Sequence, residues 1–146
     1  MPYICNMNKA TLEIMENIPS KIDTDKTLQL IKSSKGTKSY FGLLKTITNE
    51  DDKEISDWLD ISVKTFRSYK NTQKVTKPSL TEHVIILISL FKHGLEIFGN
   101  HVAFKNWLEK ENFYFDKKAP IEFMHSISGM KFIDDRLTAI EYGDNA

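Results

Sequence analysis

Apolar residues recur along this chain at spacings of three and four, which is the period of an α-helix. Residues 40–47 show this spacing with Phe41, Leu44 and Ile47, and residues 52–59 show it again with Ile55 and Trp58. No stretch sustains the period-two alternation of a strand, and the dipeptides Asn-Gly and Asp-Gly of tight hairpins do not occur. The pattern therefore predicts an all-α fold.

The expected helices begin and end at residues with known end preferences. Asn8 suits the cap of a short helix that Pro19 ends, Ser62 suits the cap of a later one, and Gly99 suits the end of the longest. Residues 1–38 are interpreted as a loosely organised N-terminal extension. We expect helices over 25–32, 40–47, 52–59, 63–70, 79–98 and 101–110, a short one opened by Pro120, and a last one that follows Gly129 and reaches Tyr142.

The segment 54–70 has the pattern of a helix-turn-helix. A turn at 60–62 joins two short helices, and Ile61 is expected to be buried as the pivot between Leu59 and Phe66. In DNA-binding modules of this kind the second helix enters the major groove. The chain has 20 basic and 20 acidic residues and no formal net charge, yet the stretch from Ser62 to Pro78 holds five basic residues and no acid. The expected contacts to operator DNA are Lys64, Thr65, Arg67, Ser68, Lys70 and Lys74. The alternative is that this unit serves packing alone.

The run from Val84 to Phe91 is apolar nearly all round its helix, which is more than one intramolecular face needs. We therefore expect the helix over 79–98 to form a homodimer interface. A two-fold dimer would in turn favour a palindromic operator.

The features that follow Gly99 have a recognisable order. They are Trp107-Leu108, Pro120, Gly129, Leu137 and the ending Ile140-Glu141-Tyr142-Gly143. In this order and spacing the chain resembles the toxin-binding domain of the Xre/MbcA/ParS family of antitoxins, and residues 61–66 resemble the family's Xre-like helix-turn-helix. The resemblance covers roughly residues 40–146. It departs from the family in the loop after Trp107-Leu108, which keeps an Asn but lacks the usual Leu-Gly-Gly stretch.

The resemblance implies the antitoxin of a bacterial type II toxin–antitoxin system. Its cognate partner would be a RES-domain toxin that degrades NAD, and the antitoxin would dimerise, cover the toxin's active site and act as an autorepressor at its own operator. Residues 39–98 would then be the DNA-binding and dimerisation region, and residues 99–146 the toxin-binding domain. The expected toxin-binding residues are Trp107, Phe113, Asp135, Arg136, Glu141, Tyr142 and Gly143.

Within this C-terminal region the last helix carries Phe132, Ile133, Leu137 and Ile140 as an inward stripe, and its other face offers Lys131, Asp134, Asp135, Arg136 and Glu141. The tail from Glu141 to Ala146 is acidic and expected to be mobile when no toxin is bound. The rings at 113–115 either cap the core or expose at least one aromatic residue as an interface contact.

Nothing in the chain has the pattern of an active site. The four histidines do not pair with Cys5 or with a serine, no glycine-rich phosphate loop occurs, and no metal-ligand spacing is present, so we expect no enzyme, metal or cofactor. The first residues do not resemble a signal peptide, and the longest apolar run is too short to cross a membrane, so a cytoplasmic protein is expected. The alternatives to an antitoxin are a helix-turn-helix transcription regulator and an interaction adaptor, each without a toxin partner.

Overall fold

The fold is taken from a computed structural model, which describes residues 8–33, 38–72 and 76–146. Over these residues every regular element is a helix, which confirms the all-α prediction. Lys74, one of the expected DNA contacts, lies outside the described residues. In chain order the elements are α1 (Lys9–Asn17), α2 (Thr24–Ser33), α3 (Lys38–Thr48), α4 (Asp52–Trp58), α5 (Val63–Asn71), α6 (Pro78–Phe98), α7 (His101–Glu109), the 3₁₀ helices η2 (Phe113–Phe115) and η3 (Pro120–Phe123), and α8 (Ile127–Glu141).

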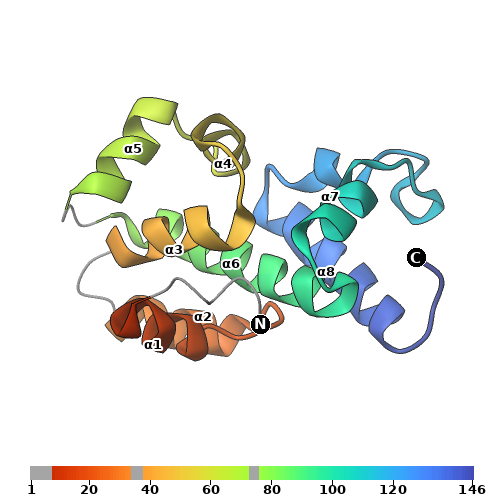
Figure 1. The fold of residues 1–146 in the computed structure, drawn as a ribbon, viewed down its shortest axis with the longest axis horizontal. Helices are drawn as coiled ribbons and strands as arrows, with labels where there is room; N and C mark the ends of the chain where they lie inside the picture. The colour runs from red at the N-terminus through yellow and green to blue at the C-terminus, as the bar shows by residue number, and fades with distance from the viewer. Residues whose placement is uncertain (1–7, 34–37, 73–75) are drawn as a thin grey trace.

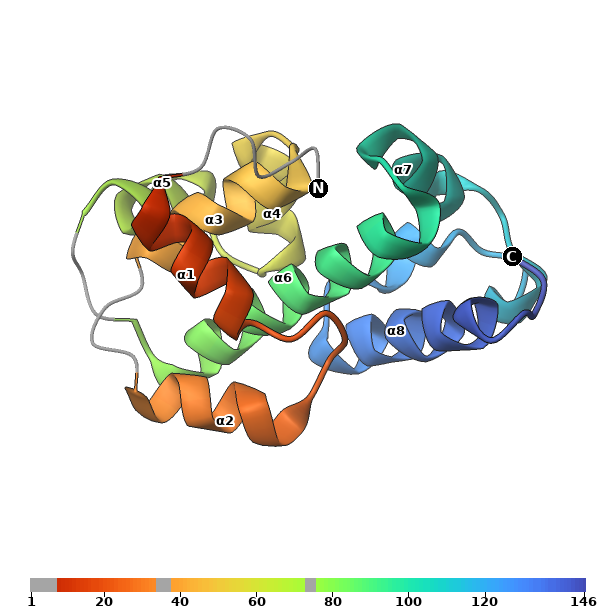
Figure 2. The same ribbon diagram turned by 60° about the horizontal axis from the view of Figure 1, so that its bottom comes forward.

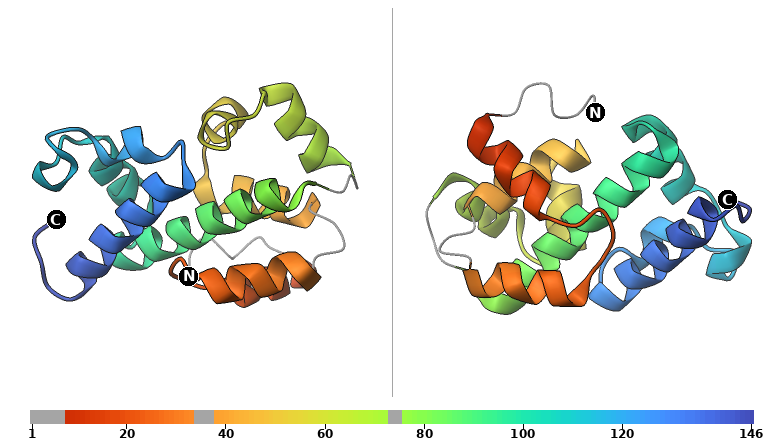
Figure 3. Two further views of the ribbon diagram at one scale, coloured as in Figure 1. Left: turned by 180° about the vertical axis from the view of Figure 1, so that it is seen from behind. Right: turned by 90° about the horizontal axis from the view of Figure 1, so that it is seen from below.

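Helix α6 forms the centre of the molecule. It packs against α2 and α3 toward its beginning and against α7 and α8 toward its end, as Figures 1 and 3 show. Every apolar side chain from Val84 to Phe91 is at most 3% exposed within the single chain. The prediction that this run forms a homodimer interface is therefore wrong, because the intramolecular core already uses all of its faces.

The helix ends follow the local sequence closely. The side chains of Asn8 and Ser62 accept hydrogen bonds from the backbone N–H groups of Thr11 and Thr65 at 2.8 and 3.0 Å. Gly99 ends α6 with a φ of 86°, a left-handed conformation that favours glycine. These ends confirm the expected caps.

Helix α8 begins earlier than expected. Its cap is Ser126, whose side-chain oxygen accepts a hydrogen bond from the Gly129 N–H at 3.0 Å. Gly129 therefore lies inside the first turn of α8 rather than before it. The glycine is needed there because a Cβ at this position would come within 1.9 Å of the Phe123 carbonyl oxygen in η3.

The N-terminal helices are an integral part of the fold rather than a loose extension. The side chains of Met15 and Ile18 belong to the core, and the buried ammonium of Lys92 in α6 donates to the backbone carbonyls of both residues, at 2.7 and 2.5 Å. The connection between α1 and α2 passes beside α6 and α8 (Figure 2), where the Ile22 N–H donates to the Asp134 carboxylate at 3.2 Å. These contacts join the N-terminal helices to the last helix.

Candidate functional site

Helices α4 and α5, at the upper left of Figure 1, are two short helices joined by a turn, in the segment that the sequence predicts as a helix-turn-helix. Trp58 and Phe66 are buried between this unit and the core, whereas Ile61 in the turn is only half-buried. Ile61 therefore packs against the core without being the fully buried pivot that the sequence indicated.

The outward face of α5 carries several of the expected DNA contacts. Lys64 is exposed, and Thr65, Ser68 and the unpredicted Tyr69 are half-buried. These residues of α5 line a surface hollow of about 450 Å³. Tyr69 also stacks on Phe41 with ring centres 5.2 Å apart, so it fixes one side of the hollow against α3.

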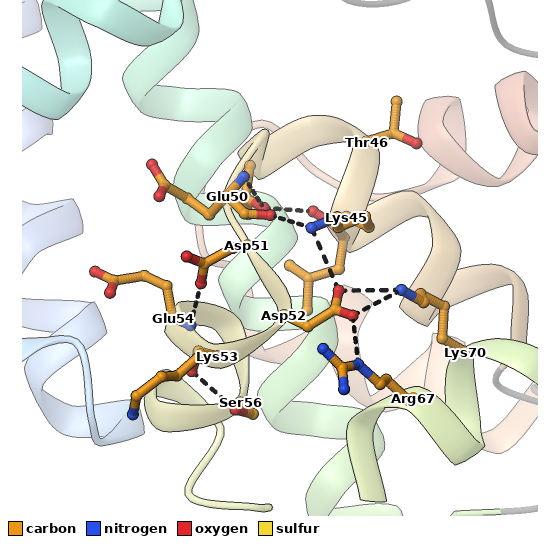
Figure 4. A network of polar contacts seen from close by, with 12 residues as sticks. Lys45, Thr46, Glu50, Asp51, Asp52, Lys53, Glu54, Ser56, Arg67 and Lys70 are labelled. Atoms are coloured by element: carbon orange, nitrogen blue, oxygen red, sulfur yellow. Dashed lines mark hydrogen bonds and ion pairs between the residues drawn. The ribbon is translucent and has the colours of Figure 1, made fainter. Parts of the chain in front are cut away.

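The other two described cations of the expected contact set have an internal partner. The Asp52 carboxylate, at the start of α4, accepts from Arg67 Nε at 2.9 Å and from Lys70 Nζ at 3.0 and 3.2 Å (Figure 4). Lys45 Nζ from α3 lies 3.3 Å from the same carboxylate and also donates to the Glu50 carbonyl. Arg67, and then Lys70 and Lys45, hold the pKa of Asp52 far below its usual range against the opposing effect of burial.

Because of this arrangement, fewer exposed and unpaired basic side chains remain in the patch than the sequence indicates. Arg67 and Lys70 are charge-compensated by Asp52, and among the described cations of the patch Lys64 and Lys77 stay exposed without such a carboxylate contact. The sequence between Ser62 and Pro78 gives no sign of this, because the acid comes from the preceding helix.

The C-terminal region is built around a chain of aromatic rings. Trp107 in α7 stacks on Phe104 and contacts the edge of Phe115, with ring centres 6.2 and 6.0 Å apart. Of the three rings at 113–115, Phe115 is buried, Tyr114 is partly exposed and Phe113 is 80% exposed. The expectation that at least one of them faces outward is confirmed.

Arg136 in α8 holds the chain after Gly143 against this aromatic region. Its guanidinium carbon lies 3.4 Å from the centre of the Tyr114 ring, and it pairs with Asp144 at 2.9 Å and with the Asn145 carbonyl. The carbonyl of Ala146 accepts from the Trp107 ring N–H at 3.3 Å. These contacts correct the expectation of a mobile tail, because the segment is bound beside a hollow of about 350 Å³ formed by α7 and η2.

Comparison with known families identifies this region. Residues 93–143 match the family model described as the antitoxin Xre/MbcA/ParS C-terminal toxin-binding domain. The matched residues, 51 of the 146 in the chain, are similar to the toxin-binding domain of the Xre/MbcA/ParS antitoxin family. This confirms the resemblance of the C-terminal region, and it supports an antitoxin role with a toxin as the partner. No curated protein matches the chain.

The end of α8 completes the toxin-binding domain. Tyr142 is 81% exposed, and Gly143 follows with a φ of 99°, which favours glycine. Glu141 pairs with Lys21 at 2.6 Å, and Lys21 holds the pKa of Glu141 below its usual value. The ammonium of Lys21 also lies 5.5 Å from the centre of the Tyr142 ring. The N-terminal segment therefore positions two of the expected toxin contacts.

Two positions of α8 in the toxin-binding domain differ from the sequence expectation. Asp134 was placed on the outer face, but it is buried and bonds to His93 Nδ1 at 2.7 Å as well as to the Ile22 N–H. Phe132 was placed in the inward stripe, but it is 45% exposed and packs against the edge of Phe115. A helical period alone cannot place these side chains, because N-terminal residues cover the helix on one side and η2 on the other.

The expected toxin contacts thus fall on two parts of the toxin-binding domain. Trp107, Phe113 and Arg136 meet where the tail lies against α7 and η2, although Trp107 is itself largely buried. Asp135 instead faces the N-terminal segment, in a pocket of about 190 Å³ with Ile22 and Thr24. Among the described residues no cluster of His, Cys, Asp or Glu has the geometry of a metal site, and no helix is long and apolar enough to cross a membrane.

Proposed function

We propose that this chain is the antitoxin of a bacterial type II toxin–antitoxin pair and neutralises a RES-type, NAD-degrading toxin by covering its active site. The match of residues 93–143 to a toxin-binding domain carries this proposal. The RES identity of the toxin comes from the family resemblance. In this function residues 99–146 bind the toxin, residues 39–98 bind DNA, and residues 1–38 support both through their packing.

The exposed side chains of the C-terminal region suit a protein interface. Phe113 and Tyr142 present large rings to solvent, and Tyr114 presents a ring already covered by the Arg136 guanidinium. Aromatic and arginine side chains supply most of the binding energy in protein interfaces. Glu141 and the tail residue Asp144 would have to leave their basic partners, Lys21 and Arg136, to enter a toxin pocket shaped for the phosphates of a dinucleotide.

The second activity in this proposal is autorepression through α4 and α5. Lys64, Thr65 and Ser68 share the outward face of α5, where a recognition helix meets base edges and phosphates. Binding as a homodimer would match a palindromic operator, and the dimer surface must lie outside the buried run of α6. In the cell this protein would act in the cytoplasm.

The test is co-expression of the chain with the product of its adjacent gene. We expect a stable complex and recovery of cellular NAD, and we expect the double variant Phe113→Ala, Tyr142→Ala to lose both. Lys64→Glu serves as the matched control, because it should weaken duplex binding and leave toxin neutralisation intact. If the two proteins never associate and the neighbour's toxicity is unchanged, the antitoxin proposal is wrong. A chain that binds DNA without any toxin partner would instead be a transcription regulator.

A further inference from the structure

Two cations of the helix-turn-helix are held by an acid of the same unit. Arg67 Nε and Lys70 Nζ, both from α5, converge on the carboxylate of Asp52 at distances between 2.9 and 3.2 Å (Figure 4). Asp52 is only 14% exposed, and Lys70 is 22% exposed and lies 5.5 Å from the centre of the Phe66 ring. Lys70 is thus drawn back against the protein rather than extended into solvent.

We propose that Asp52 limits the affinity of the DNA-binding surface for the phosphate backbone, because its carboxylate withholds Arg67 and Lys70 from the phosphates of the duplex. The proposal rests on the DNA binding proposed above. A carboxylate and a phosphate oxygen are acceptors for the same N–H donors, so an internal carboxylate competes with the nucleic acid for these two side chains.

The position of Asp52 suits such competition. It is the first residue of α4, and the first helix of a helix-turn-helix crosses the phosphate backbone while the second enters the groove. The carboxylate thus occupies the edge of the unit where a phosphate would approach. Like any aspartate it is ionised at neutral pH, and its depressed pKa extends the competition to more acidic conditions.

Withheld cations lower the sequence-independent part of the affinity. That part arises from counterion release and grows with each lysine or arginine that neutralises a phosphate. Contacts to base edges by Lys64, Thr65 or Ser68 do not depend on Asp52. Because specific and non-specific complexes share these phosphate contacts, Asp52 lowers the affinity for both, and a random-sequence duplex shows this effect without any contribution from base edges.

The experiment compares the full-length chain with its Asp52→Asn variant on a 30-base-pair duplex pool of random sequence, between 50 and 200 mM salt. We expect the slope of log K against log salt to become steeper by about 1.8, which is about 0.9 for each of two released cations. At 100 mM salt the affinity should rise at least about five-fold, by the same counterion release. Asp57→Asn is the matched control: it removes the same charge from α4, but Asp57 pairs with Lys53 on an exposed face, and we expect little change in slope.

The first half of a second arm uses the wild-type chain and does not require Asp52→Asn to fold. In the wild-type chain, Lys70→Gln should leave the salt slope unchanged, with Lys53→Gln as its charge-matched control. In the Asp52→Asn background the same substitution should lower the slope by about 0.9. Two results would overturn the role of Asp52 while leaving DNA binding intact. One is that Lys70→Gln lowers the salt slope of the wild-type chain by about 0.9. The other is that the salt slope of Asp52→Asn equals that of the wild type. If neither the wild type nor Asp52→Asn binds any duplex, the DNA-binding function itself fails, and this inference with it.

Discussion

Replacement of Gly129 by alanine tests how α8 is joined to η3. A Cβ at this position would lie 1.9 Å from the carbonyl oxygen of Phe123, and that oxygen is backbone, which cannot rotate away. The first turn of α8 must therefore move away from η3 or unwind. Unwinding would also break the hydrogen bond from the Gly129 N–H to the Ser126 cap.

The size of the effect follows from three contributions. Overpacking a closely packed site costs about 1–3 kcal/mol, and loss of a serine cap costs about 1 kcal/mol. Alanine in place of glycine inside a helix returns about 1 kcal/mol. We expect Gly129→Ala to lower the free energy of unfolding by about 2 kcal/mol, which is about 4–8 °C in Tm for a chain of this size.

The matched control is Gly42→Ala in α3, where a Cβ meets no atom within 4 Å. There only the helix preference operates, so the variant should be more stable by about 0.5–1 kcal/mol. Both variants can be measured by urea denaturation, followed by tryptophan fluorescence, to which Trp58 and Trp107 both contribute, and by far-UV circular dichroism. Gly129→Ala with wild-type or higher stability would show that the contact between α8 and η3 is not tight, and the reasoning would be refuted.

Three further substitutions test other parts of the structure. Lys92→Met leaves the carbonyls of Met15 and Ile18 without their donor, so we expect about 1–3 kcal/mol lower stability and faster amide exchange in α1; unchanged exchange would contradict the role of Lys92. Asp52 has a depressed pKa, so its contribution is present above its ordinary value of 3.8 and is lost as the pH falls through the folded pKa. The difference in free energy of unfolding between wild type and Asp52→Asn, measured in urea, should accordingly become smaller below pH 4. A difference that grows as the pH falls would contradict the depressed pKa of Asp52. Phe113→Ala should leave Tm nearly unchanged but weaken toxin binding roughly ten-fold by calorimetry; equal affinity would remove Phe113 from the interface.

The parts of the fold that the sequence predicts are those that nearby residues decide. Asn8, Ser62 and Gly99 are all recognisable, because each satisfies backbone groups within a few residues of itself. The register of the central helices follows from the same helical period. Local patterns are sufficient for the fold class and for the positions of the two short helices α4 and α5.

The parts that the sequence does not predict depend on partners that are distant along the chain. Asp134 has the spacing of a surface residue, yet it is buried by His93, which is 41 positions away, and by Ile22, which is 112 away. Asp52 compensates Lys70 across 18 positions, so counting charges within one segment overstated the basic patch. The all-apolar run of α6 was assigned to a dimer because a sequence does not show how many helices surround another.

The central position of α6 also bears on how the two proposed activities are connected. The match to the toxin-binding domain begins at His93, inside α6, and the ring of His93 bonds to Asp134 of α8. The other end of α6 packs against α3, which supports the helix-turn-helix. Between the two regions Lys105 of α7 pairs with Glu50 at 2.8 Å, and the His101 ring bonds to the Ile47 carbonyl at 2.7 Å. Because α6 packs against both regions and polar contacts join them, the proposed toxin-binding and DNA-binding surfaces share one core. If both activities hold, a toxin bound to the C-terminal region would lie at a fixed position relative to DNA bound at α5.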